Sequence, residues 1–343
     1  MKNLWIIILL ALFIAGCGKK AEEKKQPSGI DTTAMKTSPL QNPNQQFVLR
    51  YKFEKGKRYS YKMASFTEDK QTVHADTTFT DQVKQSIVYS LDISLNNVDK
   101  DSVLDLSCDI NSILLDAFAN GQFFSYRSGV TTDTVEKRKY AQYDAMVNNP
   151  FNVRINKYGG ILEISNIDNV ISKFLRLKGM TKSASLEERE SLRQNIIENA
   201  LKPLVTQLFR EMTPNVVAKD SNWTFVQPPT PFLIFKLENT NLYKVDNLEK
   251  YNNDKVATIA AGLHTVISGD TKYEERGAVF QFKKPVTSAS GKIYFNITKG
   301  LIQKSNVQTQ VDIFYTMEMP TPKGKQKGTK TEVITSKNVV ELL

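Results

Sequence analysis

The chain has 343 residues and a formal net charge of +10, with 40% hydrophobic and 24% charged residues. These fractions are ordinary for a globular protein and argue against a disordered or fibrous chain. The excess of positive charge is spread along the sequence, and the length allows one large domain or two smaller ones.

The first sixteen residues have the layout of a secretory signal peptide. Lys2 is followed by an almost unbroken apolar run from Leu4 to Ile14, which ends in two small residues before Cys17. A helix needs about 20 apolar residues to cross a membrane, so this run is too short to be a permanent anchor. We therefore predict a signal peptide over residues 1–16.

A short motif closes this apolar run. The tetrapeptide Ile14-Ala15-Gly16-Cys17 resembles the lipobox of bacterial lipoproteins. The resemblance implies cleavage between Gly16 and Cys17 and the attachment of acyl chains, such as palmitate, to Cys17. Two such chains would hold the protein stably at a membrane, because each buried methylene contributes about 0.8 kcal/mol. The alternative is an ordinary signal peptide or short N-terminal helix with an incidental cysteine.

The lipobox predicts a lipid-anchored membrane protein of the cell envelope. We expect the outer membrane, with the periplasmic and surface faces both left open, and no nucleic-acid partner outside the cytoplasm. Residues 17–45 would form a flexible lipidated tether, because few of them are large and apolar. With Cys17 acylated, only Cys108 remains, so no internal disulfide can form. Cys108 alternates with apolar residues, which predicts a buried strand position in preference to a reactive thiol.

Apolar and polar side chains alternate through residues 46–165. This period of two predicts antiparallel strands with one covered face. The expected elements are a hairpin over 47–63 that turns at Lys55-Gly56, a strand pair over 87–95 and 104–110, a helix over 135–148, and a hairpin over 151–164.

A helical segment is predicted over residues 166–212. Ser185 and Glu188 fit a capping box, and apolar residues then recur at three- and four-residue steps up to Leu208, with Pro203 as a break. The apolar stripe of this segment should lie against the sheet.

The alternating pattern returns in residues 213–343. A hairpin turns at Lys299-Gly300, and its long return strand suggests a wide curved sheet. Residues 320–331, with four lysines, read as an exposed basic loop that either binds anionic lipid or only solubilises the chain. The predicted fold class is α+β, mainly antiparallel β. We expect a curved sheet or half-barrel packed against the helical segment, as one domain or as two β halves, 46–165 and 213–343.

Residues that catalysis and metal binding require are scarce. His74 and His264 are the two histidines, far apart in the sequence, and cysteine and histidine clusters with zinc spacing are absent from it. The sequence has no nucleophile elbow and no glycine-rich phosphate or dinucleotide loop. We therefore expect no enzyme activity, no metal and no cofactor. The strand aromatics fit core packing, although a sheet curved around a helix can also leave an apolar lumen.

Three segments carry a resemblance to a known family. They are Leu49-Arg50-Tyr51-Lys52-Phe53-Glu54-Lys55-Gly56, Ile155-Asn156-Lys157-Tyr158-Gly159-Gly160-Ile161-Leu162-Glu163-Ile164 and Asp220-Ser221-Asn222-Trp223. Together they resemble an uncharacterised family of bacterial envelope lipoproteins, with a domain of unknown function. The expected architecture is also similar to the half-barrels of the periplasmic lipoprotein carriers, and that similarity implies a fold and no function.

These observations predict a membrane-anchored, non-enzymatic envelope lipoprotein. Its partners would be the membrane, through the N-terminal lipid, and either an apolar or amphiphilic ligand or an envelope protein. Two other hypotheses stay open, which are a structural or scaffold lipoprotein of an envelope complex and an envelope hydrolase.

Overall fold

The structure is a computed structural model and describes residues 29–343 apart from 41, 43 and 323. The predicted signal peptide and the lipobox residues Gly16 and Cys17 lie outside the described residues. None of the helices in the described segments is long and apolar enough to cross a membrane.

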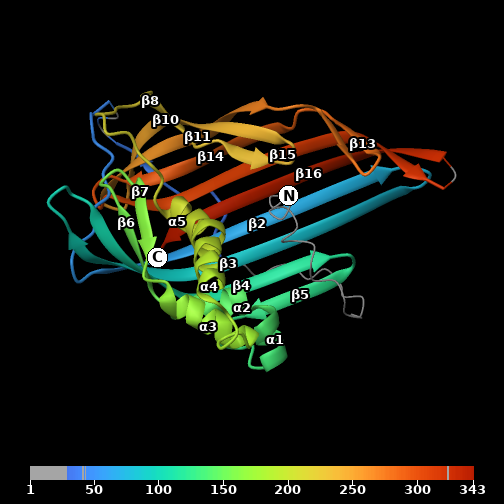
Figure 1. The fold of residues 1–343 in the computed structure, drawn as a ribbon. Helices are drawn as coiled ribbons and strands as arrows, with labels where there is room; N and C mark the ends of the chain where they lie inside the picture. Colours follow the sequence, from blue (N-terminus) through green and yellow to red (C-terminus); the bar gives the residue numbers. More distant parts are fainter. Residues whose placement is uncertain (1–28, 41, 43, 323) are drawn as a thin grey trace.

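One large antiparallel sheet forms most of the molecule, and Figure 1 shows it as an open, curved layer with the helices grouped on one side. We call the side with the helices the inner face and the opposite side the outer face. In spatial order the sheet contains β1 (Ser38–Pro39), β10 (Phe235–Tyr251), β11 (Asp254–Ser268), β14 (Val286–Asn296), β15 (Leu301–Thr321), β16 (Gly324–Leu342), β2 (Arg58–His74), β3 (Thr78–Val98), β4 (Leu104–Ala119), β6 (Phe151–Ile155) and β7 (Ile161–Ser165).

Shorter strands pair along the sides of this path. They are β5 (Gln122–Arg127) on β4, β8 (Asn222–Val226) and β9 (Thr230–Phe232) on β10, and β13 (Ala278–Phe282) on β15, with β12 (Lys272–Glu275) on β13. The predicted fold class is thereby confirmed.

The two predicted β halves join in a single sheet. The last strand, β16, pairs with β2 from Thr329–His74 to Leu342–Tyr61. The strand pair expected around residues 87–110 is confirmed as β3 and β4, and the turn at Lys299-Gly300 joins β14 to β15. The hydrogen-bonded ladders that join β15, β16, β2 and β3 are long and unbroken, so the sheet is long in the direction of its strands.

Side-chain caps mark the start of two of the described helices, at Asp133 and Ser185. Asp133 caps α1 (Thr134–Lys139), which is followed by α2 (Ala141–Met146) and by α3 (Asp168–Lys178). The predicted capping box is present at the start of α4 (Leu186–Ile196), where the Ser185 and Glu188 side chains each bond the other's backbone N–H.

Pro203 does not end the helical segment. The chain passes from α4 through a π-helical turn, η2 (Ile197–Leu201), into α5 (Lys202–Leu208), and Pro203 lies in the first turn of α5. The Lys202 N–H bonds to the carbonyl of Ile197 with the spacing of a π-helix, and the helix continues past this junction through Pro203, which has no N–H to donate.

The hairpin predicted for residues 47–63 is wrong in its first arm. Leu49, Tyr51 and Phe53 are buried as the alternation indicated, but they form no strand with β2. The Tyr51 N–H donates to the carbonyl of Lys157, and the next N–H donates to Gly300, both at 2.9 Å. The alternation arises because this extended segment crosses the end of the sheet and bonds to two separate turns.

The exposed basic loop predicted for residues 320–331 is also wrong. Most of that segment is the paired end of β15 and β16, and its described lysines face acidic partners. Lys325 and Lys327 lie 2.5 and 3.5 Å from Glu318, and Lys330 lies 2.8 Å from Glu332. The segment is thus strand and not loop, and these ion pairs offset part of its charge, while Lys325 and Lys327 are exposed as expected.

A candidate ligand-binding cavity

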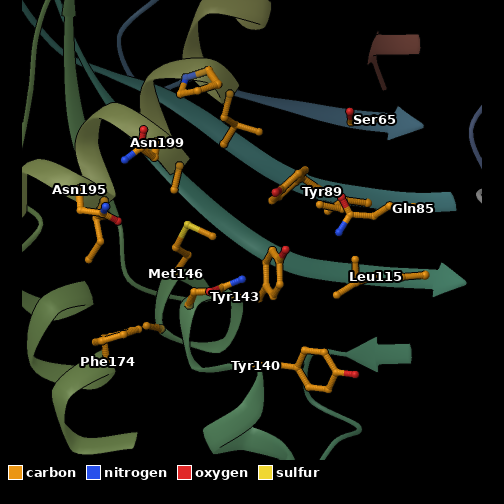
Figure 2. A pocket seen from close by; sticks show the side chains of 18 of the residues that line it. Ser65, Gln85, Tyr89, Leu115, Tyr140, Tyr143, Met146, Phe174, Asn195 and Asn199 are labelled. Carbon is orange, nitrogen blue, oxygen red and sulfur yellow. The ribbon is translucent and has the colours of Figure 1, made fainter. Parts of the chain in front are cut away.

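A cavity of about 480 Å³ lies between the inner face of the sheet and the helices. Figure 2 shows its lining side chains converging from β2, β3 and β4 on one side and from α2, α3, α4 and η2 on the other. Pockets of about 300–1,000 Å³ with mostly apolar walls are typical small-molecule sites. The predicted apolar lumen is therefore present as a geometric feature.

Alternate side chains of the strands form the side of the cavity that belongs to the sheet. Alternate residues of β3, including Ile87 and Tyr89, line the cavity, as do Leu115 and Ala117 on β4. Successive strand residues point to opposite faces, so every second side chain reaches the same space.

Apolar residues at every fourth position form the side of the cavity that belongs to the helices. Leu192, Ile196, Ala200 and Leu204 all line the cavity and belong successively to α4, η2 and α5. Side chains four positions apart lie on one helix face, and the π-helical turn lies in the middle of this row. The apolar stripe of the helical segment was expected to contact the sheet. Along part of its length it is separated from the sheet, and the cavity lies between the two.

Aromatic side chains form the base of the cavity. Tyr140 and Tyr143 line it, and the buried Tyr126 packs below them, with ring centroids 5.2 and 6.2 Å away. The Tyr126 hydroxyl donates to Asp144 at 2.9 Å, and Lys173 lies 3.5 Å from the same carboxylate. Burial raises the pKa of Tyr140 to about 12, so its hydroxyl stays protonated at neutral pH. This network fixes the base of the cavity in place.

The polar groups of the lining are mostly amides and hydroxyls. Asn195 and Asn199 extend from the helix wall, Gln85 from β3 and Ser65 from β2 (Figure 2). Among the lining residues that the structure describes, Lys139 carries the one charged side chain, and none is Asp, Glu, His or Cys. The lining thus combines apolar walls with amides, hydroxyls and one ammonium group.

The candidate residues from the sequence lie elsewhere. His74 and His264 are both exposed, on β2 and β11, with β14, β15 and β16 between those strands. Within the described residues no three His, Cys, Asp or Glu side chains are grouped to hold a metal. Cys108 is fully buried on β4, where burial raises the pKa of its thiol to about 12, as expected for a core residue.

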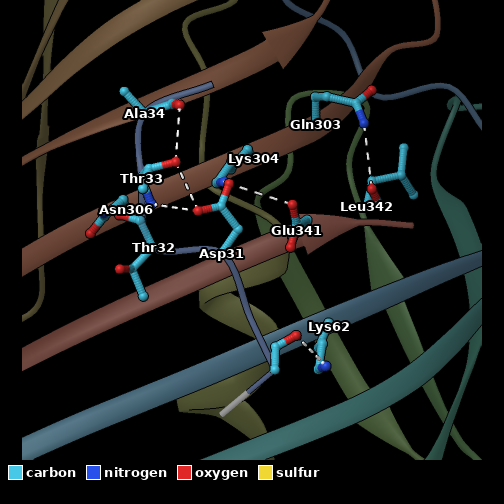
Figure 3. Close-up of polar contacts among 11 residues, drawn as sticks. Asp31, Thr32, Thr33, Ala34, Lys62, Gln303, Lys304, Asn306, Glu341 and Leu342 are labelled. Carbon is cyan, nitrogen blue, oxygen red and sulfur yellow. Dashed lines mark hydrogen bonds and ion pairs between the residues drawn. The ribbon is translucent and has the colours of Figure 1, made fainter. Parts of the chain in front are cut away.

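On the outer face, residues 29–40 form a feature that we call the strap (Figure 3). Ile30 is buried against Ala64, Val88 and Val339. Met63 on β2 belongs to the core beneath the helices, and Ala64 follows it in the chain. Successive strand residues point to opposite faces, so Ala64 and the residues packed around Ile30 lie on the outer face.

Polar contacts hold the strap across several strands. The Asp31 carboxylate lies 2.7 Å from the Nζ atom of Lys304, whose side chain is only 4% exposed. Lys62 donates to the carbonyl of Gly29 at 2.6 Å, and Asn306 donates to that of Thr32 at 2.7 Å (Figure 3). These hydrogen bonds link the strap to β2 and β15.

The strap ends at the edge of the sheet, where β1 pairs with β10. The flexible tether predicted to reach residue 45 therefore differs from the structure in its second half. The Ile30 contacts, the ion pair of Asp31 with Lys304, the two hydrogen bonds to strap carbonyls and the β1 pairing together place this segment against the sheet.

Comparison with known proteins matches residues 101–302, more than half of the chain, to a family described as a family of unknown function (DUF6263). The chain belongs to this family. The predicted resemblance to an uncharacterised family is thereby confirmed, and the matched residues include the lining residues of β4, the helices and their connections. A comparison with curated proteins finds no match.

Several solved structures are similar to this member of the family. One, on lipid-protein interactions in lipovitellin, has a TM-score of 0.43 and 12% identity over 85% of this chain and 25% of that chain. This chain thus spans a quarter of the length of that relative. An outer membrane channel from Pseudomonas putida F1 has a TM-score of 0.20 and 6% identity over 85% of this chain and 97% of that chain. OccK2 (OpdF) from Pseudomonas aeruginosa has a TM-score of 0.19 and 8% identity, with coverages of 87% and 100%.

The residues that line the cavity were only partly visible in the sequence. The row from Leu192 to Leu204 belongs to the apolar stripe that the helical spacing indicated. The sequence gave no sign that Lys139, Gln85 and Asn199 would line a cavity. A lysine or an amide near a helix end or in a strand is common on any protein surface. Only the packing of α1 and α2 beside β5 brings Lys139 to the cavity.

Proposed function

We propose that this protein is a non-enzymatic binding protein that holds an apolar or amphiphilic molecule of the cell envelope in the cavity between sheet and helices. The observation that carries the proposal is the cavity itself, about 480 Å³ in volume, with apolar walls from β3, β4 and α4. Burying apolar ligand surface there would stabilise the complex by roughly 25 cal/mol per Å².

The composition of the walls supports binding over catalysis. Tyr89, Leu115, Met146 and Phe174 provide apolar contact area, and the amides of Asn195 and other rim residues provide a few polar anchors. A mostly apolar pocket with a small number of polar groups is the usual design of a site that orients a ligand.

We also propose that Cys17 is acylated and anchors the protein to a membrane of the envelope. Gly29 is the first residue of the strap that the structure describes, so at most the eleven residues 18–28 would separate the lipid from it, a reach of about 40 Å when fully extended. Such a short tether would keep the cavity near the membrane surface, where amphiphiles are concentrated. Incorporation of labelled palmitate into the protein, and its loss in Cys17→Ser, tests the anchor.

The binding proposal is tested by identifying what the protein carries. The full chain is purified from cells, extracted with organic solvent, and the released molecules are measured by mass spectrometry. Ala117→Phe places a ring in the cavity, whereas Ala289→Phe changes a half-buried alanine on β14, outside the lining.

We expect one class of amphiphile, near one molecule per chain, in the wild type and in Ala289→Phe, and a loss of at least tenfold in Ala117→Phe. Equal amounts in all three proteins, or none in any of them, would contradict the proposal.

A further inference from the structure

The charge of the cavity points to the head group of its ligand. Lys139, at the last position of α1, is the one charged residue in the lining that the structure describes, and no carboxylate lines the cavity. A half-buried ammonium group with no carboxylate beside it in the lining gives this part of the cavity a positive potential.

The ammonium group of Lys139 is held by aromatic rings instead of an acid. Its Nζ atom lies 5.1 Å from the ring centre of Phe124 and 5.4 Å from that of Tyr140, and both rings line the cavity. Lys139 forms none of the ion pairs found among the described residues, whereas the nearby Lys173 pairs with Asp144. A cation held in this way keeps its hydrogens available to an acceptor.

The strand register places this cation at one end of the cavity. Phe124 on β5 is opposite Ala117 on β4, and Ala117 is opposite Gln85 on β3. Gln85 and Tyr140 lie together on one side of Figure 2, while Met146 and Phe174 lie toward the other. The cation therefore lies at one end of the cavity, and the other end combines the apolar Met146 and Phe174 with the uncharged amides of Asn195 and Asn199.

We propose that the ligand is an anionic amphiphile, whose carboxylate or phosphate head group lies at Lys139 with Gln85 nearby and whose apolar chain extends between β4 and α4. This inference rests on the proposed function and adds the charge of the ligand to it. A carboxylate or phosphate accepts hydrogen bonds from an ammonium group, and such charge-assisted bonds are the stronger ones.

Four probes that share a dodecyl chain test the inference. Dodecanoate and dodecyl phosphate are anionic, dodecanol is neutral and dodecylamine is cationic. Binding to the full chain is measured by calorimetry at neutral pH, with Cys17→Ser in every protein so that no acyl group is attached there.

In the parent protein we expect the two anions to bind about 10- to 100-fold more tightly than dodecanol, the range for a hydrogen bond to a charged group. Lys139→Gln should abolish that preference and leave dodecanol binding unchanged. Lys139→Arg should retain the preference, and Lys139→Glu should shift it to dodecylamine.

Lys157→Gln is the matched control, because Lys157 Nζ also lies over a tyrosine ring, 5.5 Å from Tyr158, but outside the cavity. We expect it to bind all four probes as the parent does. Equal binding of dodecanol and the anions, or an unchanged preference in Lys139→Gln, would overturn the head-group inference while leaving the proposed function standing. Failure of every probe to bind would overturn both.

Discussion

The substitution Ala117→Phe distinguishes a real cavity from a filled core by the sign of its effect on stability. Ala117 is half-buried and lines the cavity beside Phe124. A phenylalanine side chain that becomes buried contributes roughly 1.5–3 kcal/mol relative to an exposed one. Because part of the new ring stays at the open side, we expect the free energy of unfolding to rise by about 1 kcal/mol.

Ala257→Phe provides the opposite case. Ala257 on β11 is completely buried and does not line the cavity, so its added ring has no space. Overpacking of this kind costs about 1–3 kcal/mol. Urea unfolding of both variants against the parent measures the two changes, as shifts of midpoint at constant slope. Destabilisation of Ala117→Phe by as much as Ala257→Phe would refute the reasoning, because it would mean that the cavity is closed in solution.

Three further predictions concern the thiol, the strap and the helix cap. With its pKa raised to about 12 by burial, Cys108 should not react with iodoacetamide at pH 8 in Cys17→Ser protein until urea unfolds it, and labelling under native conditions would contradict this burial. The lysine that hydrogen-bonds Asp31 holds the pKa of this carboxyl well below its usual range, so the contribution of the pair is fully present above about pH 4 and is lost as the pH falls toward that lowered pKa. The protection factors of amides in residues 29–36, which are exchange rates corrected for intrinsic exchange, should therefore be lower at pH 2 than at pH 6, and Asp31→Asn should show low protection at both. Ser185→Ala should lower the free energy of unfolding by about 1 kcal/mol because the capping box is lost, whereas Ser183→Ala, outside the cap, should change it by less than about 0.5 kcal/mol.

Local patterns in the sequence were enough to predict much of the fold. The β3 and β4 pair and the β14 and β15 hairpin were visible because alternating side chains flank a short turn. The capping box at Ser185 marked the start of α4 for a similarly local reason. Each of these elements depends on contacts between residues close in the chain.

Features that depend on distant contacts were not predictable in this way. The pairing of β16 with β2 joins residues 255 to 281 positions apart, from Thr329 and His74 to Leu342 and Tyr61, and closes two apparent halves into one sheet. Residues 47–53 showed a strand pattern, yet Phe47 forms a single bridge with Val217 and the residues that follow bond to the turns at Lys157 and Gly300. Their alternation reports burial, and burial alone does not identify a hydrogen-bonding partner.

The cavity follows from curvature, which no single segment encodes. Leu192 and Leu204 have the same spacing whether their stripe touches the sheet or stands away from it. Lys139 acquires its setting only because β5 brings Phe124 beside the end of α1. The charge and the space of the site therefore become visible only when the sheet and helices are assembled.

The most direct test is to find where the ligand chain lies. A dodecanoate with a photoreactive diazirine near its methyl end is bound to the full chain, irradiated, and its crosslinks are located by peptide mass spectrometry. We predict crosslinks at the end of the cavity away from Lys139, in the peptides that contain Met146, Phe174 or Ile196. Crosslinks confined to the strap or to other outer-face residues would contradict the account, because the bound chain would then lie outside the cavity.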